Sequence, residues 1–165
     1  MRLYVMRHGV AIDRHDPGAP SDPTRPLTAD GKERARLAAH GLVSLGLAID
    51  RIWTSPYLRA TETADIVAES LGVPRLAIEQ RAELIPENDP AATVAALRST
   101  NLRGLMLIGH APHLDELISH LLGCAHSLTA LKKAGVAVLD LRSPADRARL
   151  IALYEPKVLR QLGRQ

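Results

Sequence analysis

Short apolar runs alternate with helix-like segments along the chain, and this alternation restricts the possible fold more than any other feature. Runs bounded by polar residues or glycine, the pattern of buried strands, occur at Arg2 to Met6, Arg51 to Thr54 and Leu105 to Ile108. Strands that alternate with helices favour a mainly parallel sheet covered by helices on both faces. The sequence therefore predicts an α/β fold, a three-layer α/β/α sandwich.

The segments between these strands carry the capping residues typical of helices. Thr28 can cap a helix that runs to about Leu45. Ser55, followed by proline, can start a second helix that Gly72 ends. The same reasoning predicts helices over residues 55–71, 90–98 and 112–122.

The last part of the chain predicts an antiparallel edge to the sheet. Gly135 to Leu141 and Arg149 to Tyr154 have the pattern of two strands, which the turn residues 143–146 would join. The proline-rich stretch from Asp13 to Leu27 cannot continue a helix or a central strand, so it predicts a surface loop after the first strand. No repeat or linker is visible, and we expect a single domain over residues 1–165.

Composition narrows the functional classes. Cys124 is the only cysteine, which excludes an internal disulfide and a cysteine-based zinc cluster. The formal charge of +3 is spread over scattered arginines and suits an anionic ligand, while an aromatic content of 2% offers few surfaces on which bases could stack. We therefore expect no nucleic acid partner.

The chain also lacks the sequence signals of a membrane protein. No apolar run approaches the length that crosses a bilayer, and the residues after Met1 have no signal-peptide layout. These features predict a cytoplasmic protein with no membrane contact. The sequence leaves the oligomeric state open.

Chemically active side chains follow three of the predicted strands. The first strand ends in Arg7 and His8, and the third is followed by His110. The second leads through Ser55 into a helix that has Arg59 in its first turn. Ligands of open α/β sheets bind beyond the carboxyl ends of the strands. We therefore expect these guanidinium and imidazole groups to meet at one edge of the sheet.

This combination of side chains favours a phosphoryl group as the ligand. Arginine presents a planar fork of donors that matches phosphate oxygens, and helix N-termini add oriented amides. The sequence contains neither a glycine-rich phosphate loop with its lysine nor a clear aspartate cluster for magnesium. Arginines would then neutralise the phosphate charge, and we expect no metal ion and no cofactor.

Three motifs in this order resemble the histidine phosphatase superfamily, also called phosphoglycerate mutase-like. They are "RHG" at residues 7–9, "SPYLRATETA" at residues 55–64 and "GH" at residues 109–110. Within the superfamily, "RPLT" at residues 25–28 and "GHAPHL" at residues 109–114 are similar to the small bacterial phosphohistidine phosphatases. The resemblance covers essentially the whole chain, which leaves little room for an inserted helical subdomain. It implies an open, shallow site that could accept a phosphorylated side chain of another protein.

The resemblance assigns the nucleophile to His8. A neutral imidazole nitrogen can attack phosphorus and form a phosphohistidine that water then hydrolyses. For this reaction the other ring nitrogen should keep its proton on a backbone carbonyl group. Gly9 would let the backbone turn tightly around the ring.

The resemblance also assigns the phosphate ligands to Arg7, Arg59 and a protonated His110. These donors would hold the equatorial oxygens of the phosphoryl group through the transfer. Arg25, at the end of the proline-rich loop, is a further candidate ligand for the phosphate or the substrate.

In the family, a carboxyl group protonates the leaving group, and it belongs to a loop after the third strand of the family's own fold. "AELIPEND" at residues 82–89 makes Glu83 the first candidate here, with Glu87 and Asp89 as alternatives. A leaving imidazole needs less help than an alkoxide, so this acid would matter little for a phosphohistidine substrate.

Two nearby side chains have simpler interpretations. Ser55 is expected to cap a helix rather than to act as a nucleophile, since no base is predicted beside it. His113, three residues after His110, is expected at the surface rather than in a metal site, because no further ligands accompany it.

The leading hypothesis is a metal-independent phosphatase that removes phosphate from phosphohistidine in a signalling or phosphotransfer protein, through a covalent phosphohistidine of its own. The alternatives are a phosphatase for small phosphomonoesters and a non-catalytic module that binds phosphorylated ligands. An intact His8 beside both arginines favours catalysis, because binding alone does not need the nucleophile. The expected partner is thus a phosphorylated protein or a small phosphate ester.

Overall fold

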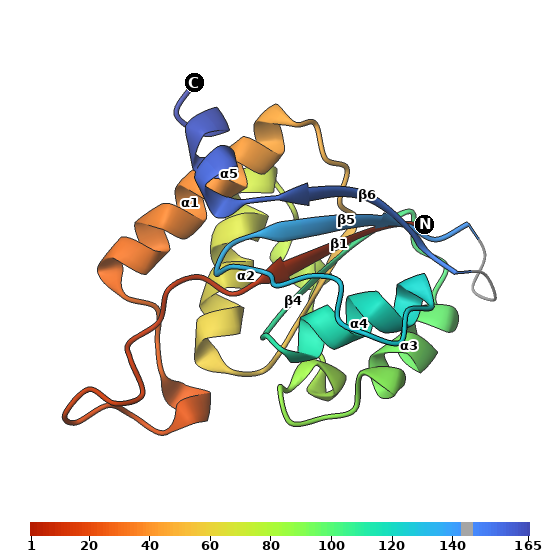
Figure 1. The fold of residues 1–165 in the computed structure, drawn as a ribbon. Coiled ribbons are helices and arrows are strands. Elements are labelled where there is room, and N and C mark those ends of the chain that lie inside the picture. Colours follow the sequence, from red (N-terminus) through yellow and green to blue (C-terminus); the bar gives the residue numbers. More distant parts are fainter. Residues whose placement is uncertain (143–146) are drawn as a thin grey trace.

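The computed structural model describes residues 1–142 and 147–165, which fold into three layers (Figure 1). In this part of the chain, one sheet lies between two layers of helices. The turn predicted at residues 143–146 lies outside the described residues.

The sheet has the strand order β3-β2-β4-β1-β5-β6. Its strands are β1 (Arg2–Arg7), β2 (Arg51–Thr54), β3 (Ile78–Gln80), β4 (Gly104–Gly109), β5 (Val136–Asp140) and β6 (Arg149–Tyr154). β2 pairs in parallel with β3 and β4, and β4 pairs in parallel with β1. β5 pairs antiparallel with β1 and β6. The predicted parallel sheet with an antiparallel edge is confirmed.

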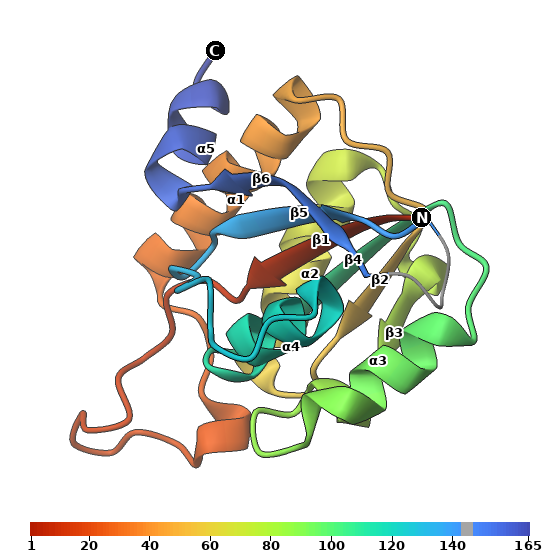
Figure 2. The same cartoon turned by 45° about the vertical axis from the view of Figure 1, so that its right-hand side comes forward.

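Helices cover both faces of the sheet. They are α1 (Ala29–Ser44), α2 (Leu58–Leu71), α3 (Pro90–Arg98), α4 (His113–Leu122) and α5 (Pro156–Leu162), with short 3₁₀ turns η1 (Asp22–Thr24), η2 (Arg75–Ala77) and η3 (Ala82–Leu84). α1, α2 and α5 cover one face, and α3 and α4 cover the other (Figures 1 and 2). The predicted three-layer α/β/α sandwich is confirmed. None of the described helices is long and apolar enough to span a membrane.

Both faces of the central strands are buried, which explains their continuous apolar sequence. In β1, Leu3 and Val5 belong to the core beneath α3 and α4, whereas Tyr4 and Met6 belong to the core beneath α1 and α2. Successive side chains of a strand face opposite sides, so a strand covered on both sides needs an unbroken apolar run. Every residue of β4 is likewise buried.

The sequence did not predict β3 or α5. β3 is a three-residue edge strand whose side chains are half-buried or exposed, so it has no apolar run. α5 buries only Leu159, which packs in the core beside α1. Both elements bury too little surface to leave a clear pattern in the sequence.

Two helices begin later than predicted. α2 begins at Leu58 rather than at the proline after Ser55, because Tyr57 has extended dihedral angles and is the N-cap residue. α4 begins at His113, one residue after the predicted start. The predicted stop at Gly72 is confirmed, since this residue ends α2 with a φ of 68°.

The loop between β1 and α1 is anchored near both of its ends. Ala11 forms an isolated antiparallel bridge with Leu27. At the start of α1, Oγ1 of Thr28 accepts the amide of Gly31 at 2.9 Å. A Cβ atom at Gly31 would lie 2.0 Å from the carbonyl oxygen of Val10, so glycine is required for α1 to start this close to the end of β1.

Gly41 brings α1 into contact with α5, because a Cβ atom there would lie 2.1 Å from the carbonyl oxygen of Leu159. We predict that Gly41→Ala lowers the free energy of unfolding by about 1–3 kcal/mol. The clash with the α5 backbone outweighs the gain of up to about 1 kcal/mol that alanine brings to a helix interior. Urea unfolding measures the change, with Val43→Ala, 47% exposed on the same helix, as the control. An unchanged or higher unfolding free energy for Gly41→Ala would contradict this packing.

Candidate active site

The carboxyl ends of β1, β2 and β4 meet at one edge of the sheet. These strands are neighbours in its parallel part, so the residues that follow them lie side by side (Figure 2). His8 follows β1, Ser55 follows β2 and His110 follows β4. The ring centroids of His8 and His110 lie 5.0 Å apart, and Arg59 reaches His8 from the first turn of α2. The predicted convergence of these groups is confirmed.

A hydrogen bond to the backbone defines the tautomer of His8. Its Nδ1 lies 2.6 Å from the carbonyl oxygen of Gly9, and a carbonyl group can only accept, so Nδ1 carries the proton. Nε2 is then unprotonated, and it accepts a hydrogen bond from Nε of Arg59 at 3.2 Å. The predicted bond between the second ring nitrogen and a backbone carbonyl is confirmed.

His8 is uncharged in this environment. Only 6% of the residue is exposed, and burial is the main cause that lowers the pKa of His8 to about 3. The Gly9 carbonyl acts in the opposite direction, while the positive charges of Arg59 and Arg7 lower the pKa further. At neutral pH, Nε2 therefore keeps its lone pair.

Gly9 lies in a crowded position beside the His8 ring. Its φ is not positive, so its conformation alone does not require glycine. A Cβ atom here would lie 3.2 Å from Cδ2 of Leu27 and 3.3 Å from the carbonyl oxygen of Gly31. The Gly9 amide donates to Oγ1 of Thr63 at 3.1 Å, which ties the end of β1 to α2.

Arg59 is a buried cation that a loop carboxylate contacts. The residue is 3% exposed, and burial is the main cause that lowers its pKa, while hydrogen bonds to Asp22 act in the opposite direction. Nη1 of Arg59 donates to the carbonyl oxygen of Asp22 at 2.6 Å, and Nη2 donates to Oδ2 of Asp22 at 3.0 Å. Asp22 belongs to η1 in the loop after β1, and sequence reasoning did not connect it with the site.

Arg7 has one donor engaged and another without a partner. Its Nη1 donates to the carbonyl oxygen of Leu131 at 2.8 Å. Its Nε is buried and has no hydrogen-bond partner among the described residues. Buried donors are almost always satisfied in folded proteins, so this nitrogen marks a position for an acceptor.

His110 likewise has one nitrogen engaged and one without a partner. Its Nε2 lies 2.9 Å from Oγ of Ser55, which also accepts the amide of Tyr57 at 3.3 Å. Its Nδ1 is buried and lacks a hydrogen-bond partner in the part of the chain that the structure describes. The expectation that no base lies beside Ser55 is therefore wrong, and its hydroxyl orients an imidazole.

His110 is uncharged in the ligand-free protein, and its protonated form at a bound phosphoryl group stays a prediction. The residue is 2% exposed, and burial is the main cause that lowers the pKa of His110 to about 2. The neighbouring His8 and Arg59 lower it further. An anion beside the ring would favour the protonated form, so protonation of His110 depends on a bound ligand.

The groups at the sheet edge face a cavity of about 440 Å³. Its lining includes nearly all of the residues predicted to form the site: Arg7, His8, Arg25, Arg59 and His110. The cavity is therefore rich in cationic groups, as an anion-binding site requires.

Arg25 has most of its donors engaged within the loop, since Nε donates to Oδ1 of Asp22 at 2.9 Å and Nη1 donates to the carbonyl oxygen of Ile12.

Of the three candidate acids, Glu87 alone lines this cavity. Its Oε2 accepts a hydrogen bond from the hydroxyl group of Tyr57 at 3.0 Å. Glu83 lies outside the lining and accepts from Nη2 of Arg81 at 2.8 Å, a bond that lowers the pKa of Glu83. Asp89 caps α3 by accepting the amide of Ala91 at 2.8 Å.

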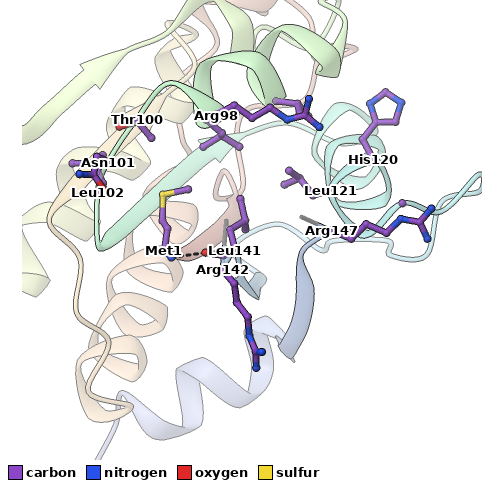
Figure 3. A pocket seen from close by; sticks show the side chains of 13 residues that line it. Met1, Arg98, Thr100, Asn101, Leu102, His120, Leu121, Leu141, Arg142 and Arg147 are labelled. Atoms are coloured by element: carbon purple, nitrogen blue, oxygen red, sulfur yellow. Dashed lines mark hydrogen bonds between the residues drawn. The ribbon is translucent and has the colours of Figure 1, made fainter. Parts of the chain in front are cut away.

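A second hollow, of about 370 Å³, lies at the opposite end of the sheet (Figure 3). Met1 and Leu141 are among its apolar lining residues, and Arg98 and His120 are among its basic ones. Arg98 lies in the last turn of α3, where its positive charge complements the carbonyl groups of the helix end, and His120 lies in the last turn of α4. Their position needs no ligand to explain it.

His113 is not a surface residue, contrary to the expectation from sequence. It is 1% exposed, and burial lowers its pKa. Within residues 1–142 and 147–165, no three side chains of His, Cys, Asp or Glu form a group that could hold a metal ion.

The neutral state of His8 gives a prediction about pH. Because the folded pKa of about 3 lies below the ordinary value of 6.5, the unfolded chain binds more protons between these two values. The free energy of unfolding should therefore fall with pH from about 6.5 downward, by about 1.4 kcal/mol per pH unit for this side chain. Urea unfolding near pH 7 and near pH 4.5 should show a weaker pH dependence for His8→Asn. His126→Asn, at an exposed position, is the control, and an equal slope for wild type and His8→Asn would contradict a neutral His8.

Comparison with known protein sequences identifies relatives of the chain. Residues 3–85 match the family model of the histidine phosphatase superfamily (branch 1). An uncharacterised protein of Picosynechococcus sp. is 38% identical, over 96% of this chain and 99% of its own length. The phosphohistidine phosphatase SixA of Escherichia coli strain K12 is 33% identical, over 73% of this chain and 74% of its own length.

Solved structures are similar over nearly the whole chain. The protein histidine phosphatase SixA complexed with tungstate has a TM-score of 0.85 at 28% identity, and the match covers 96% of this chain and 99% of that one. The putative phosphohistidine phosphatase SixA from Agrobacterium tumefaciens has a TM-score of 0.77 at 24% identity, with 94% and 98% coverage. The second likeness supports the fold alone.

Proposed function

The chain belongs to the histidine phosphatase superfamily and is a phosphatase, and we propose that it hydrolyses phosphohistidine on another protein through a covalent intermediate at His8. Arg7, Arg59 and His110 bind the phosphoryl oxygens in this proposal. The reaction needs no metal ion, because the guanidinium groups supply the positive charge that a phosphoryl group requires.

The observation that carries the proposal is the tautomer of His8. Nδ1 holds its proton on the Gly9 carbonyl oxygen, so the lone pair of the ring is on Nε2, among the donors of the cavity. A neutral imidazole with a lone pair directed at a bound phosphoryl group is the form in which histidine acts as a nucleophile. Burial keeps His8 in this form, because it lowers the pKa to about 3.

The first step transfers the phosphoryl group to the enzyme. Nε2 of His8 forms a bond to phosphorus while the bond from phosphorus to the substrate nitrogen breaks. The electron pair of that bond stays on the substrate ring, which carries a proton on its other nitrogen and therefore leaves as neutral imidazole. Nε of Arg7 is a buried donor without a partner in the described structure, and a phosphoryl oxygen would accept from it. Nδ1 of His110 is likewise buried without a partner in that part of the chain, and it would donate to a second oxygen once it carries a proton. Nε of Arg59, which now donates to Nε2, would donate to a third oxygen.

The second step returns the enzyme to its starting state. Water attacks phosphorus opposite His8, the bond from phosphorus to Nε2 breaks, and orthophosphate leaves. The same donors hold the same oxygens in both steps, so the site stabilises two similar transition states with one arrangement.

The position of the site supports a phosphorylated protein as substrate. The cavity lies at the end of the sheet, and its lining comes from the strand ends, the first turn of α2 and the loops that contain Asp22, Glu87 and Lys133. The chain is 33% identical to an Escherichia coli relative named a phosphohistidine phosphatase. A substrate imidazole that is protonated on its other nitrogen leaves as the neutral ring, so the reaction can proceed without a general acid from the enzyme.

A second candidate function, hydrolysis of small phosphomonoesters, is favoured by Glu87. This carboxyl group lines the cavity, so it lies where a group that protonates the oxygen of a leaving alcohol would have to be. We propose Glu87 for this role rather than Glu83, whose carboxylate is bound to Arg81.

The covalent mechanism predicts a burst. With 4-nitrophenyl phosphate and excess chelator, wild type should release up to one equivalent of nitrophenol per enzyme before a slower steady phase. His8→Ala should lower the turnover by about 10³-fold or more, because the nucleophile is lost. His126→Ala, at an exposed position, is the control. Equal turnover by wild type and His8→Ala would contradict the proposal.

The substrate class needs a separate measurement. A protein phosphorylated on histidine should lose its phosphate faster with wild type than with His8→Ala. Rapid turnover of alkyl phosphates with no action on phosphohistidine would support the second function instead. Binding of a phosphohistidine protein without any turnover would identify a non-catalytic module.

Substrates with different leaving groups distinguish between Glu87 and Glu83 as the general acid. Glu87→Gln should slow hydrolysis of an alkyl phosphate by about 10²-fold or more, because an alkoxide needs a proton to leave. The same variant should hardly change the turnover of 4-nitrophenyl phosphate, whose leaving group is stable as an anion. Glu83→Gln is the matched control and should leave both rates near wild type. A selective loss of alkyl phosphate turnover in Glu83→Gln would overturn the assignment.

A further inference from the structure

A carboxylate beside an anion-binding site needs an explanation, and Asp22 is such a carboxylate. It lines the cavity with His8 and Arg59, and its side chain is 35% exposed. We propose that Asp22 is a positioning residue that holds Arg59 in the orientation needed to bind the transferred phosphoryl group. This inference rests on the proposed function of the site.

Asp22 accepts hydrogen bonds at one edge of the Arg59 guanidinium group and leaves another edge to the ligand. Nη1 donates to the Asp22 carbonyl oxygen at 2.6 Å and Nη2 donates to Oδ2 at 3.0 Å, so the outer end of the group is engaged. Nε donates to Nε2 of His8 at 3.2 Å. The edge that contains Nε therefore faces the nitrogen to which the phosphoryl group is transferred, and it offers a planar pair of donors.

Asp22 is itself held from its other side by Arg25. Nε and Nη2 of Arg25 both donate to Oδ1 of Asp22, and Nη1 donates to the carbonyl oxygen of Ile12. Both carboxylate oxygens of Asp22 are thus engaged, one by each arginine. This chain of bonds links the loop after β1 to α2 and fixes the Asp22 side chain in one conformation. A donor held in this way needs no rearrangement when the charge of the substrate arrives.

Two effects of Asp22 on phosphate binding have opposite signs. Its negative charge alone repels an anion and weakens binding. Its hydrogen bonds orient Arg59, and they strengthen binding because the guanidinium group is already in place. Asp22 is paired with two guanidinium groups, which offset its charge, so the orienting effect dominates. Removal of the carboxylate therefore weakens phosphate binding, although it makes the site more positive.

The test compares Asp22→Asn and Asp22→Ala with wild type. Asparagine keeps the size of the side chain and a carbonyl acceptor, which protects the fold if alanine disrupts the loop. Asp16→Asn, an exposed residue of the same loop that does not line the cavity, is the matched control. The measurements are the dissociation constant of orthophosphate by calorimetry, and kcat and KM for 4-nitrophenyl phosphate.

We expect Asp22→Asn to weaken orthophosphate binding and to lower kcat/KM by about 10- to 100-fold, through a higher KM as well as a lower kcat. Asp16→Asn should stay within about twofold of wild type. Tighter phosphate binding or an unchanged kcat/KM in both Asp22 variants would overturn the proposal. Either result would mean that the carboxylate acts only through its charge or not at all.

A double-mutant cycle separates positioning from a general effect on the loop. If Asp22 acts through Arg59, then Asp22→Asn should weaken phosphate binding much less in an Arg59→Ala background than in wild type. An equal loss in both backgrounds would overturn the proposal, because it would show an effect independent of Arg59.

The binding measurement also distinguishes this proposal from the proposed function. A wild type that binds orthophosphate but does not turn over substrates would contradict the catalytic function, while the binding ratio between Asp22→Asn and wild type still decides the role of Asp22. A wild type that binds no orthophosphate would contradict both.

Discussion

The hydrogen bond between Nδ1 of His8 and the carbonyl oxygen of Gly9 determines what the rest of the site can do. It holds the ring proton on one nitrogen, so the other nitrogen carries a lone pair and accepts from Arg59. The bond lies just beyond Arg7, the last residue of β1, which runs between β4 and β5. A histidine buried at this position stays neutral, since burial lowers the pKa of His8 to about 3.

The groups around His8 differ in how their nitrogen atoms are engaged. Nε of Arg7 and Nδ1 of His110 are buried without hydrogen-bond partners among the described residues, and both residues line the cavity. Arg59 is engaged at its outer end, because Asp22 accepts two of its hydrogen bonds. In the function that we propose, phosphoryl oxygens are the acceptors for these groups.

The sequence predicted the groups that follow strands better than the groups that come from loops. His8, Arg59 and His110 could be found because buried strands are visible as apolar runs and their carboxyl ends meet at one sheet edge. Asp22 and Glu87 could not be singled out in the same way, because contacts with residues distant in sequence bring them to the cavity. The pairing of Ser55 with His110 was missed for the same reason, since it depends on the register of β2 against β4.

The most direct test of the account is the covalent intermediate itself. Wild type can be mixed with 4-nitrophenyl phosphate, quenched in alkali within the burst, digested and examined by mass spectrometry, since phosphohistidine survives in alkali. The account predicts one phosphoryl group, on His8, which disappears when the reaction is allowed to finish before the quench. Substrate turnover without any phosphorylated His8, or a phosphoryl group on another residue that forms and decays at the rate of turnover, would contradict it.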